Sequence, residues 1–372
     1  MLNILMIANS AAGGGAERVI LDLLRANNEI HKCNMYLSLS EEHGPLLPHF
    51  AREVKILKLS LSSNISKVIE IGRNLKRICE AHDIHAIICH TSPVSKAILR
   101  TAYFFRLPPI FPIEHTEINR QIRHTSSSWK NKTRIISTRF YYKKAKKIFA
   151  DSSMIKQELI DLAIGKRDAI SVIHCPIDTS RLTIKSCKND HKNFKIVLAG
   201  RLEEVKNFKL IIDAFEQIEK YDLLKDQNIN VSVSIYGDGP KKQSLGRRVL
   251  EKKIKTPIKI YPYTHNLLDE IYQSDLLVST SKFEGLGNVM LEAIACGVPV
   301  IATKTGGSLE IQKHVDGIAL IASDRPEDLA KIISDQIINR FLKVSDKDQQ
   351  FIGSISPIAT LPKYLTEIQK SL

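Results

Sequence analysis

Two glutamates, Glu284 and Glu292, stand eight residues apart around a glycine-containing loop. Gly287 lets the backbone pass close to a ligand, and Asn288 begins a stretch with helical spacing. A helix N-terminus offers free amides and a favourable dipole to an anion. If the whole span were helical, the two acids would be separated by about 12 Å along the axis and roughly 80° around it. An acid, an anion site and a second acid suit an extended ligand containing a sugar, a diphosphate and a ribose. Taken singly, each glutamate is better explained as a helix cap or a surface acid, and it is the pattern over residues 274–311 as a whole that favours the ligand site.

Two basic residues offer a complementary chemistry. Arg201 and Lys206 follow a predicted strand over 194–199 and precede a predicted helix. Arginine presents a fork of donors and lysine a compact charge, so the pair is suited to clamp a diphosphate. A surface ion pair of Arg201 with Glu203 or Glu204 is the less favoured alternative, because both motifs fall in the same half of the chain.

A second glycine loop lies near the start of the chain. Gly14 and Gly15 follow a predicted strand over 2–8 and precede an amphipathic run. Arg18 stands where the dinucleotide-binding fingerprint requires its third glycine, so that fingerprint is excluded. A phosphate-contacting loop and a plain tight turn are about equally compatible with these residues.

One histidine of the first half is placed where chemistry is expected. His115 lies just beyond a predicted strand over 109–113, and parallel sheets bind their ligands at the carboxyl ends of strands. His90 follows another predicted strand and is the weaker candidate. The alternative for both is a hydrogen bond within a loop.

Strand, glycine loop and helix recur along the whole chain. Apolar runs over 275–280 and 298–302 predict buried strands, and Gly297 predicts the end of the helix between them. Ser153 is expected to cap a further helix over 154–164. This order predicts an α/β fold with doubly wound parallel sheets. A chain of 372 residues is long enough for two such domains.

The motifs together resemble a known family. The stretch Glu284-Gly-Leu-Gly-Asn-Val-Met-Leu-Glu292, followed by Cys296-Gly-Val-Pro-Val, is similar to the Glu-x7-Glu donor segment of retaining glycosyltransferases of the family-4 group. Gly14-Gly-Ala-Glu-Arg and Gly200-Arg-Leu also resemble that group, which includes bacterial polysaccharide and lipopolysaccharide glycosyltransferases. The resemblance implies the GT-B architecture, two Rossmann-like domains that face a central cleft. It implies an acceptor-binding domain over 1–185, a nucleotide-sugar-binding domain over 186–353 and a crossover helix over 354–372 that returns to the first domain.

The resemblance also implies roles for the candidate residues. His115 and Glu284 would be catalytic, with Glu284 holding sugar hydroxyls and His115 approaching the sugar from the first domain. Glu292 would bind the ribose. The diphosphate would be bound by Arg201, Lys206, Gly14, Gly15, Gly287 and Asn288. The family usually has Asn where Cys175 stands and Gly where Pro262 stands, so no role is carried over to those positions.

No metal or other cofactor is expected besides the nucleotide-sugar donor. The one Asp-x-Asp motif, Asp346-Lys-Asp348, lies in a polar tail away from any predicted strand end. Six scattered cysteines without a Cys-x-x-Cys pair argue for reduced thiols and against a zinc site. Reduced thiols indicate a cytoplasmic protein. No apolar run approaches the roughly 20 residues of a membrane helix.

The charge is concentrated in the first half of the chain. The net charge is +14, and residues 1–185 hold 28 Lys and Arg against 16 Asp and Glu. The segment 118–150 carries ten basic residues, no acid and several aromatic side chains. Such a segment suits the anionic inner surface of a membrane, although a solvated basic helix face is about equally compatible. Nucleic-acid binding is less favoured because no recognised module surrounds the segment.

The predicted function is therefore sugar transfer. The donor would be a nucleotide-diphosphate sugar, with uridine favoured by the resemblance, and the acceptor a lipid-linked or glycan molecule of cell-envelope polysaccharide assembly. Retention of configuration rests on the resemblance alone. Two alternatives remain: another GT-B enzyme, such as a nucleotide-sugar epimerase or a phosphorylase, and a non-catalytic protein that binds a membrane or a polyanion.

Overall fold

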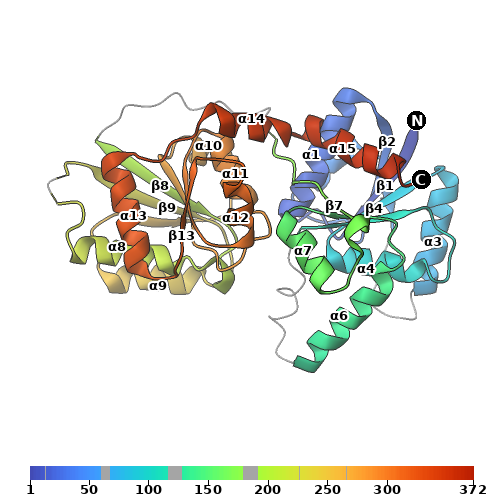
Figure 1. Cartoon of the computed structure of the whole chain (residues 1–372), viewed down its shortest axis with the longest axis horizontal. Coiled ribbons are helices and arrows are strands. Elements are labelled where there is room, and N and C mark those ends of the chain that lie inside the picture. The colour runs from blue at the N-terminus through green and yellow to red at the C-terminus, as the bar shows by residue number, and fades with distance from the viewer. Residues whose placement is uncertain (13, 60–67, 116–127, 179–191, 226, 265) are drawn as a thin grey trace. The chain divides into compact units, whose positions relative to one another are not determined.

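The computed structural model describes the chain except residues 13, 60–67, 116–127, 179–191, 226 and 265, and the side chains of 128–132. By its internal contacts the chain divides into two compact units. Unit 1 comprises Met1–Ile177 and Ile355–Leu372, and unit 2 comprises Asp178–Ser354. Figure 1 shows that each unit is a sheet covered by helices. The predicted boundary between the two domains, at residues 185 and 186, lies outside the described residues.

Unit 1 contains a seven-stranded parallel sheet in the order β3-β2-β1-β4-β5-β6-β7. Its strands are β1 Leu2–Ala8, β2 Cys33–Leu39, β3 Ile56–Lys58, β4 Ala86–His90, β5 Ile110–Glu114, β6 Ile148–Ala150 and β7 Ile170–Val172. The central strands are nearly continuous apolar runs, as expected for a sheet with helices on both faces. In register, Leu2 lies opposite Cys33, and Ile4 lies opposite Ala86.

The helices of unit 1 cover this sheet. They are α1 Gly15–Ile30, α2 Leu47–Glu53, α3 Val68–Ala81, α4 Ser92–Thr101, α6 Ser128–Tyr142, α7 Ser153–Asp161 and α15 Pro357–Gln369, with a short 3-10 turn at Arg167–Ala169. The last of these, α15, comes from the far end of the chain. Its Tyr364 ring packs edge-on against Phe149 of β6, with centroids 5.0 Å apart, so the expected return of the C-terminal helix to the first unit is confirmed.

Unit 2 contains a six-stranded parallel sheet in the order β10-β9-β8-β11-β12-β13. Its strands are β8 Asn193–Ala199, β9 Asn230–Tyr236, β10 Ile258–Tyr261, β11 Leu276–Ser279, β12 Val300–Thr303 and β13 Ile318–Ile321. Its helices are α8 Lys209–Lys220, α9 Lys242–Lys252, α10 Leu267–Tyr272, α11 Asn288–Ala295, α12 Gly306–Gln312, α13 Pro326–Asn339 and α14 Asp346–Ser354, with a 3-10 turn at Glu204–Lys206. The predicted α/β fold with two Rossmann-like sheets is thus confirmed.

Element boundaries differ from expectation at a few positions. Ser152, and not Ser153, is the N-cap of α7, because its hydroxyl accepts a hydrogen bond from the Ile155 amide at 3.2 Å. Both residues are serines, and the sequence alone does not say which one leaves the helical backbone conformation. No helix in the described part of the chain is long and apolar enough to cross a bilayer.

Candidate active site

Lys206 and Glu284 form an ion pair in unit 2. The Lys206 ammonium donates to both carboxylate oxygens of Glu284, at 2.9 Å and 2.7 Å. Lys206 follows β8, and Glu284 follows β11, the neighbouring strand of the sheet. The two side chains are only 22% and 15% exposed, so solvent screens this pair less than an ordinary surface pair. The structure therefore brings together Lys206, which is predicted to bind the diphosphate, and Glu284, the predicted catalytic acid.

Two further hydrogen bonds hold the loops that carry this pair. The Lys282 amide donates to the Val205 carbonyl at 2.9 Å, and the Thr280 hydroxyl donates to the Lys206 carbonyl at 2.9 Å. Both bonds join the loop after β8 to the loop after β11. The ion pair is thus built on positions that the backbone already fixes, which is the condition for a preorganised site.

The loop that carries Glu284 ends at the N-terminus of α11. Gly287 is the N-cap with a φ of 84°, a backbone conformation that favours glycine. A Cβ atom there would lie 2.2 Å from the Met290 methyl carbon and 2.9 Å from Cγ of Glu284. No side chain of the described residues caps this end. The Met290 amide donates to the Gly287 carbonyl at 2.9 Å, so the amides of Asn288 and Val289 are the ones expected to be open to an anion.

The neighbouring helix α12 shows the opposite arrangement. Thr305 and Ser308 form a capping box that occupies its first amides. The Gly307 amide instead donates to the Glu284 carbonyl at 2.9 Å, and a Cβ at Gly307 would lie 2.6 Å from the Leu286 carbonyl oxygen. The α12 N-terminus therefore supports the Glu284 loop, whereas the α11 N-terminus stays the predicted anion site.

Glu292 lies in the second turn of α11. Because the helix begins only at Asn288, the estimate for a fully helical span from Glu284 does not apply. Glu292 is half-buried. Burial raises the pKa of the Cys296 thiol to about 12, and the charge of Glu292 adds to this increase. Its assignment to a ribose stays a prediction.

Arg201 lies at the surface. Its side chain is 75% exposed, and its Nε lies 2.7 Å from a carboxylate oxygen of Glu203. The surface ion pair of Arg201 with Glu203, which was the less favoured alternative from the sequence, is therefore present. A role for Arg201 at a diphosphate, which would require it to leave Glu203, stays a prediction.

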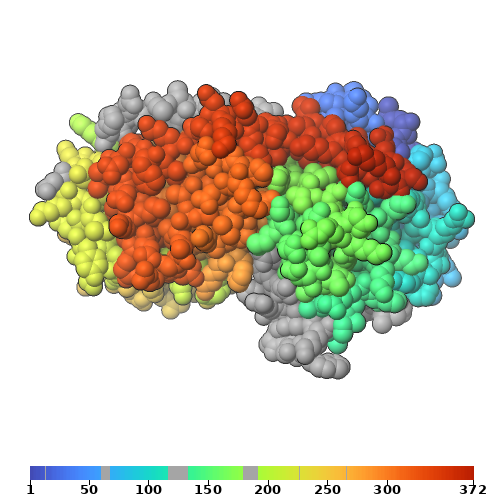
Figure 2. Space-filling model, viewed as in Figure 1, coloured from blue at the N-terminus to red at the C-terminus, as the bar shows by residue number. Residues whose placement is uncertain are grey.

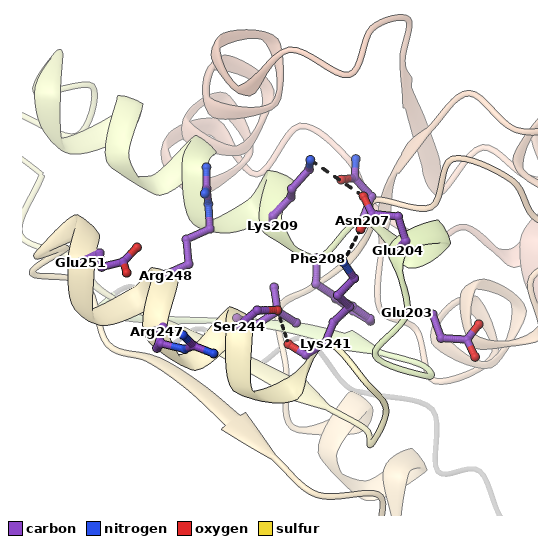
Figure 3. Close-up of a pocket in the computed structure, with 11 residues that line it drawn as sticks. Glu203, Glu204, Asn207, Phe208, Lys209, Lys241, Ser244, Arg247, Arg248 and Glu251 are labelled. Carbon is purple, nitrogen blue, oxygen red and sulfur yellow. Dashed lines mark hydrogen bonds and ion pairs between the residues drawn. The ribbon is translucent and has the colours of Figure 1, made fainter.

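A cavity of about 420 Å³ lies beside the same loop. Figure 3 shows that residues at the start of α8 face residues of α9 across it, with Lys209 and Lys241 both directed toward Glu204. Its lining has mixed charge and contains none of the predicted donor-binding residues. The cavity therefore does not coincide with the candidate site.

The Asp-x-Asp motif of unit 2 has a structural role. The Asp348 carboxylate accepts hydrogen bonds from the backbone amides of Asp316, Gly317 and Ser345, at 2.6, 3.0 and 2.8 Å. These amides hold the loop before β13 against α14. The carboxylate is committed to backbone donors and is not presented to a ligand.

In unit 1, three side chains meet at the carboxyl ends of adjacent strands. His115 follows β5, Asp151 follows β6 and Cys175 lies three residues beyond β7. The His115 Nδ1 lies 2.6 Å from Oδ2 of Asp151, and the Cys175 thiol donates to the same oxygen at 2.9 Å. Asp151 and Cys175 were not predicted as site residues, although the strand-end argument used for His115 applies to Asp151 too.

The environment of His115 favours its charged form. Burial lowers the pKa of His115, but the charge and the hydrogen bond of Asp151, together with smaller contributions from Glu114 and Glu17, raise it above its usual value. Glu17 lies in the first turn of α1, directly after the N-cap Gly14 and Gly15. Because β1, β4 and β5 are parallel neighbours, the glycine loop after β1 lies at the same edge of the sheet as His115.

Two more buried groups adjoin His115. The His90 Nδ1 lies 3.3 Å from Nε2 of His115, and burial lowers the pKa of His90 well below its usual value. Glu114 accepts a hydrogen bond from the Tyr142 hydroxyl, and burial raises the pKa of Glu114 to about 7. His115 therefore lies between a carboxylate on one side and a neutral imidazole on the other.

Comparison with known proteins gives a consistent result for both units. The family model "Glycosyltransferase Family 4" matches residues 13–181, and the model "Glycosyl transferases group 1" matches residues 181–352. The Anabaena protein HepE, solved in complex with UDP and glucose, has the same fold, with a TM-score of 0.77, 18% identity and full coverage of both chains.

The matches to curated relatives cover smaller parts of the two sequences than the structural match does. The N-acetyl-alpha-D-glucosaminyl L-malate synthase of Bacillus anthracis is 28% identical over 32% of this chain and 30% of that protein. The N-acetylgalactosamine-N,N'-diacetylbacillosaminyl-diphospho-undecaprenol 4-alpha-N-acetylgalactosaminyltransferase of Campylobacter jejuni is 22% identical over 79% of this chain and 78% of that protein. For the first three such relatives, the chain covers 30%, 61% and 17% of their own length, below two thirds in each case.

Proposed function

We propose that this chain, which belongs to the GT-B glycosyltransferases through its family 4 and group 1 domains, transfers a sugar from a nucleotide-diphosphate donor to an acceptor hydroxyl. The observation that carries the proposal is the Lys206–Glu284 pair next to the uncapped N-terminus of α11. The ion pair supplies a cation and an acid, and the helix end beside it supplies amides. Hydrogen bonds between the loops already fix the positions of all three.

The departing diphosphate requires charge stabilisation. Lys206 and the first amides of α11 supply it, and donors aimed at developing charge are often the largest catalytic contribution. Arg201 would add a forked donor once it turns from Glu203. Glu284 would orient Lys206 and hold hydroxyls of the sugar, and Glu292 would bind the ribose. The reaction then proceeds without a metal, a proposal supported by the commitment of Asp348 to backbone amides.

The residue of unit 1 that acts on the transferred sugar is His115 in this proposal. Asp151 holds its Nδ1 and favours the imidazolium, which suits a group that stabilises negative charge during transfer. The glycine loop at Gly14 and Gly15 would contact the diphosphate from the same edge. Retention of the anomeric configuration follows from the family resemblance and is part of the proposal.

The donor and acceptor are proposed from relatives. The structural neighbour HepE was solved with UDP and glucose, which supports a UDP-sugar. The Campylobacter relative carries an undecaprenol-linked acceptor in its name, which supports a lipid-linked or glycan acceptor in polysaccharide or lipopolysaccharide assembly. A cytoplasmic enzyme at the inner membrane surface would have access to both the UDP-sugar donor and the lipid-linked acceptor.

A surface of unit 1 supports attachment to such a membrane. Phe104, Ile136 and Phe140 are 70%, 61% and 51% exposed, and Lys143 and Lys144 beside them are also exposed. Figure 2 shows that atoms of α6 lie at the surface of unit 1. Apolar and cationic side chains side by side suit an anionic lipid surface. Residues 118–127 of the predicted basic segment, and the side chains of 128–132, lie outside the described residues.

Thermal stabilisation by nucleotides tests the proposed function. The purified chain would be melted with UDP, GDP and ADP, alone and with their common sugars, beside a Glu292→Ala variant. We expect one nucleotide to raise the melting temperature, and this increase to shrink in the variant. If a well-folded protein shows no increase with any nucleotide, the transferase proposal fails and a non-catalytic binding protein takes its place.

A further inference from the structure

Three different donor atoms converge at one point of unit 1. Nδ1 of His115, a carboxylate oxygen of Asp151 and Sγ of Cys175 all lie within 4.8 Å of one another. Imidazole, carboxylate and thiolate are the ligands that Zn²⁺ uses in proteins. A thiolate disfavours Mg²⁺ and Ca²⁺, which prefer oxygen. The donor set therefore indicates a soft divalent cation.

The distances are close to those of a tetrahedral zinc site. Zinc bonds of about 2.0 Å to nitrogen and about 2.3 Å to sulfur place the two atoms roughly 3.5 Å apart at the tetrahedral angle. The distance between the Cys175 Sγ and the His115 Nδ1 is 3.5 Å. The Asp151 Oδ2, at 2.6 Å and 2.9 Å from these atoms, would need to retreat by roughly 0.7 Å, which a small rotation of its carboxylate accomplishes.

The second oxygen of Asp151 supplies an independent observation. Its side chain is 2% exposed, and Oδ1 has no hydrogen-bond partner among the residues that the structure describes. Leaving a buried carboxylate oxygen unpaired is costly. A cation with a water molecule as its fourth ligand would satisfy this oxygen.

The surroundings of His115 fit a metal-bound imidazole. A histidine that binds a metal usually donates its other ring N–H to a fixed acceptor, which orients the ring. The His115 Nε2 lies 3.3 Å from Nδ1 of the fully buried His90, and the two rings stack with an interplanar angle of 15°. His90 would thus accept this hydrogen bond and fix the His115 ring.

We propose that His115, Asp151 and Cys175 form a binding site for one Zn²⁺ or a similar thiophilic divalent cation, with water as the fourth ligand. On binding, the protons on the Cys175 thiol and on the His115 Nδ1 leave to solvent, and the two hydrogen bonds to Asp151 are replaced by metal–ligand bonds. The site contains none of the donor-binding residues of unit 2. It includes His115, so a bound cation would take the place of the imidazolium that the proposed transfer requires. Spacing along the chain does not reveal it, because the three residues come from three separate strand ends.

Cobalt substitution tests this site directly. The full-length, tag-free protein would be treated with a chelator and titrated with Co²⁺, and the near-ultraviolet charge-transfer band of a cobalt–thiolate bond would be recorded. We expect one equivalent of Co²⁺ to produce this band, and Zn²⁺ to abolish it. The band reports a thiolate ligand, so Co²⁺ bound to surface histidines does not contribute to it.

Matched variants identify the ligands. Cys175→Ser should remove the band, whereas Cys79→Ser, a buried cysteine of α3 in the same unit, should leave it unchanged. Asp151→Asn should weaken Co²⁺ affinity by tenfold or more and keeps the proposal testable if Cys175→Ser does not fold. The proposal is overturned if the wild-type protein gives no band, or if the band persists in Cys175→Ser. In that case the three residues form only a hydrogen-bond network around His115.

Discussion

Lys206 and Glu284 lie 78 residues apart in the sequence and are joined through both oxygens of one carboxylate. The contact places the cation that would neutralise a diphosphate directly on the acid that would hold the sugar. It also lies next to Gly287, whose absent Cβ would approach Cγ of Glu284. The cation, the acid and the helix end proposed to bind the anion are therefore adjacent, and substitutions in any of them should affect donor binding.

The first prediction concerns Gly287. Gly287→Ala forces a side chain into a φ of 84° and against Met290, so we expect a loss of about 1–3 kcal/mol in unfolding free energy and weaker nucleotide binding. Gly246→Ala is the control, because a Cβ there meets nothing within 4 Å. It lies inside α9, where alanine should stabilise by up to about 1 kcal/mol. Urea unfolding of both variants measures the change in unfolding free energy. An equal change in both would show that the Gly287 conformation is not strained by a side chain.

The second prediction concerns His115. His115→Ala should lower kcat by roughly 100-fold, a typical effect of removing one charge-stabilising group, with a smaller change in KM for the donor. His49→Ala, at an exposed histidine of the same unit, should leave both constants unchanged. The assays contain a chelator, so that metal binding does not contribute. Should His115→Ala change KM alone, the residue contributes to binding and not to the transfer step.

The third prediction concerns stability in acid. Glu367 of α15 pairs with Lys147 and accepts a hydrogen bond from the Ser171 hydroxyl at 2.9 Å. These contacts lower the pKa of Glu367 to about 2 from an ordinary value of 4.5. A lowered folded-state pKa contributes stability that is complete above the ordinary value and is lost as the pH falls toward the folded one. The contribution should thus be full above about pH 5 and disappear near pH 2.

Glu367→Gln tests this assignment. The difference in unfolding free energy between wild type and variant should be largest at neutral pH and shrink steadily below about pH 4.5. Glu42→Gln, at an exposed glutamate, should show no such trend. A difference that stays constant down to pH 2 would mean that the charge of Glu367 does not hold α15 to the sheet.

The fourth prediction concerns the membrane surface. Replacing Lys143 and Lys144 by glutamate should reduce binding to phosphatidylglycerol vesicles by roughly 30-fold or more, since each lysine near an anionic surface contributes about 1 kcal/mol. The same double change at Lys55 and Lys58, which are exposed at the edge strand β3, is the control. Equal loss in both variants, or no vesicle binding by wild type, would contradict a dedicated surface around α6.

The sequence was sufficient for the fold and for most of the elements that carry the site. Apolar runs such as that of β11 predicted the parallel sheets, and Gly287 predicted the uncapped start of α11. It was not sufficient for contacts across long separations. Lys206 and Glu284 were each proposed, but nothing in their spacing shows that they pair. Arg201 was assigned to a diphosphate, although it has Glu203 only two residues away and forms an ion pair with it.

Unit 1 shows the same limit more clearly. His115 was proposed from its place after β5, but Asp151 was missed because an aspartate before two serines is typical of a turn. Cys175 was noticed only as a departure from the family pattern. The three residues meet because β5, β6 and β7 are adjacent in the sheet, a fact of topology that residue spacing does not contain. Scattered cysteines argued against a zinc site, whereas the site proposed above takes its other two ligands, His115 and Asp151, from neighbouring strand ends.

Calorimetric titration with UDP tests the central claim most directly. Wild type would be compared with Lys206→Ala and with Lys209→Ala, an exposed lysine three residues away whose charge faces Glu204. Loss of a hydrogen bond to a charged group costs about 1.5–3 kcal/mol. The account predicts that Lys206→Ala weakens UDP binding by about 10-fold to 100-fold and that Lys209→Ala does not weaken it. Equal affinity of wild type and Lys206→Ala for UDP would contradict the assignment of the Lys206–Glu284 pair as the donor site.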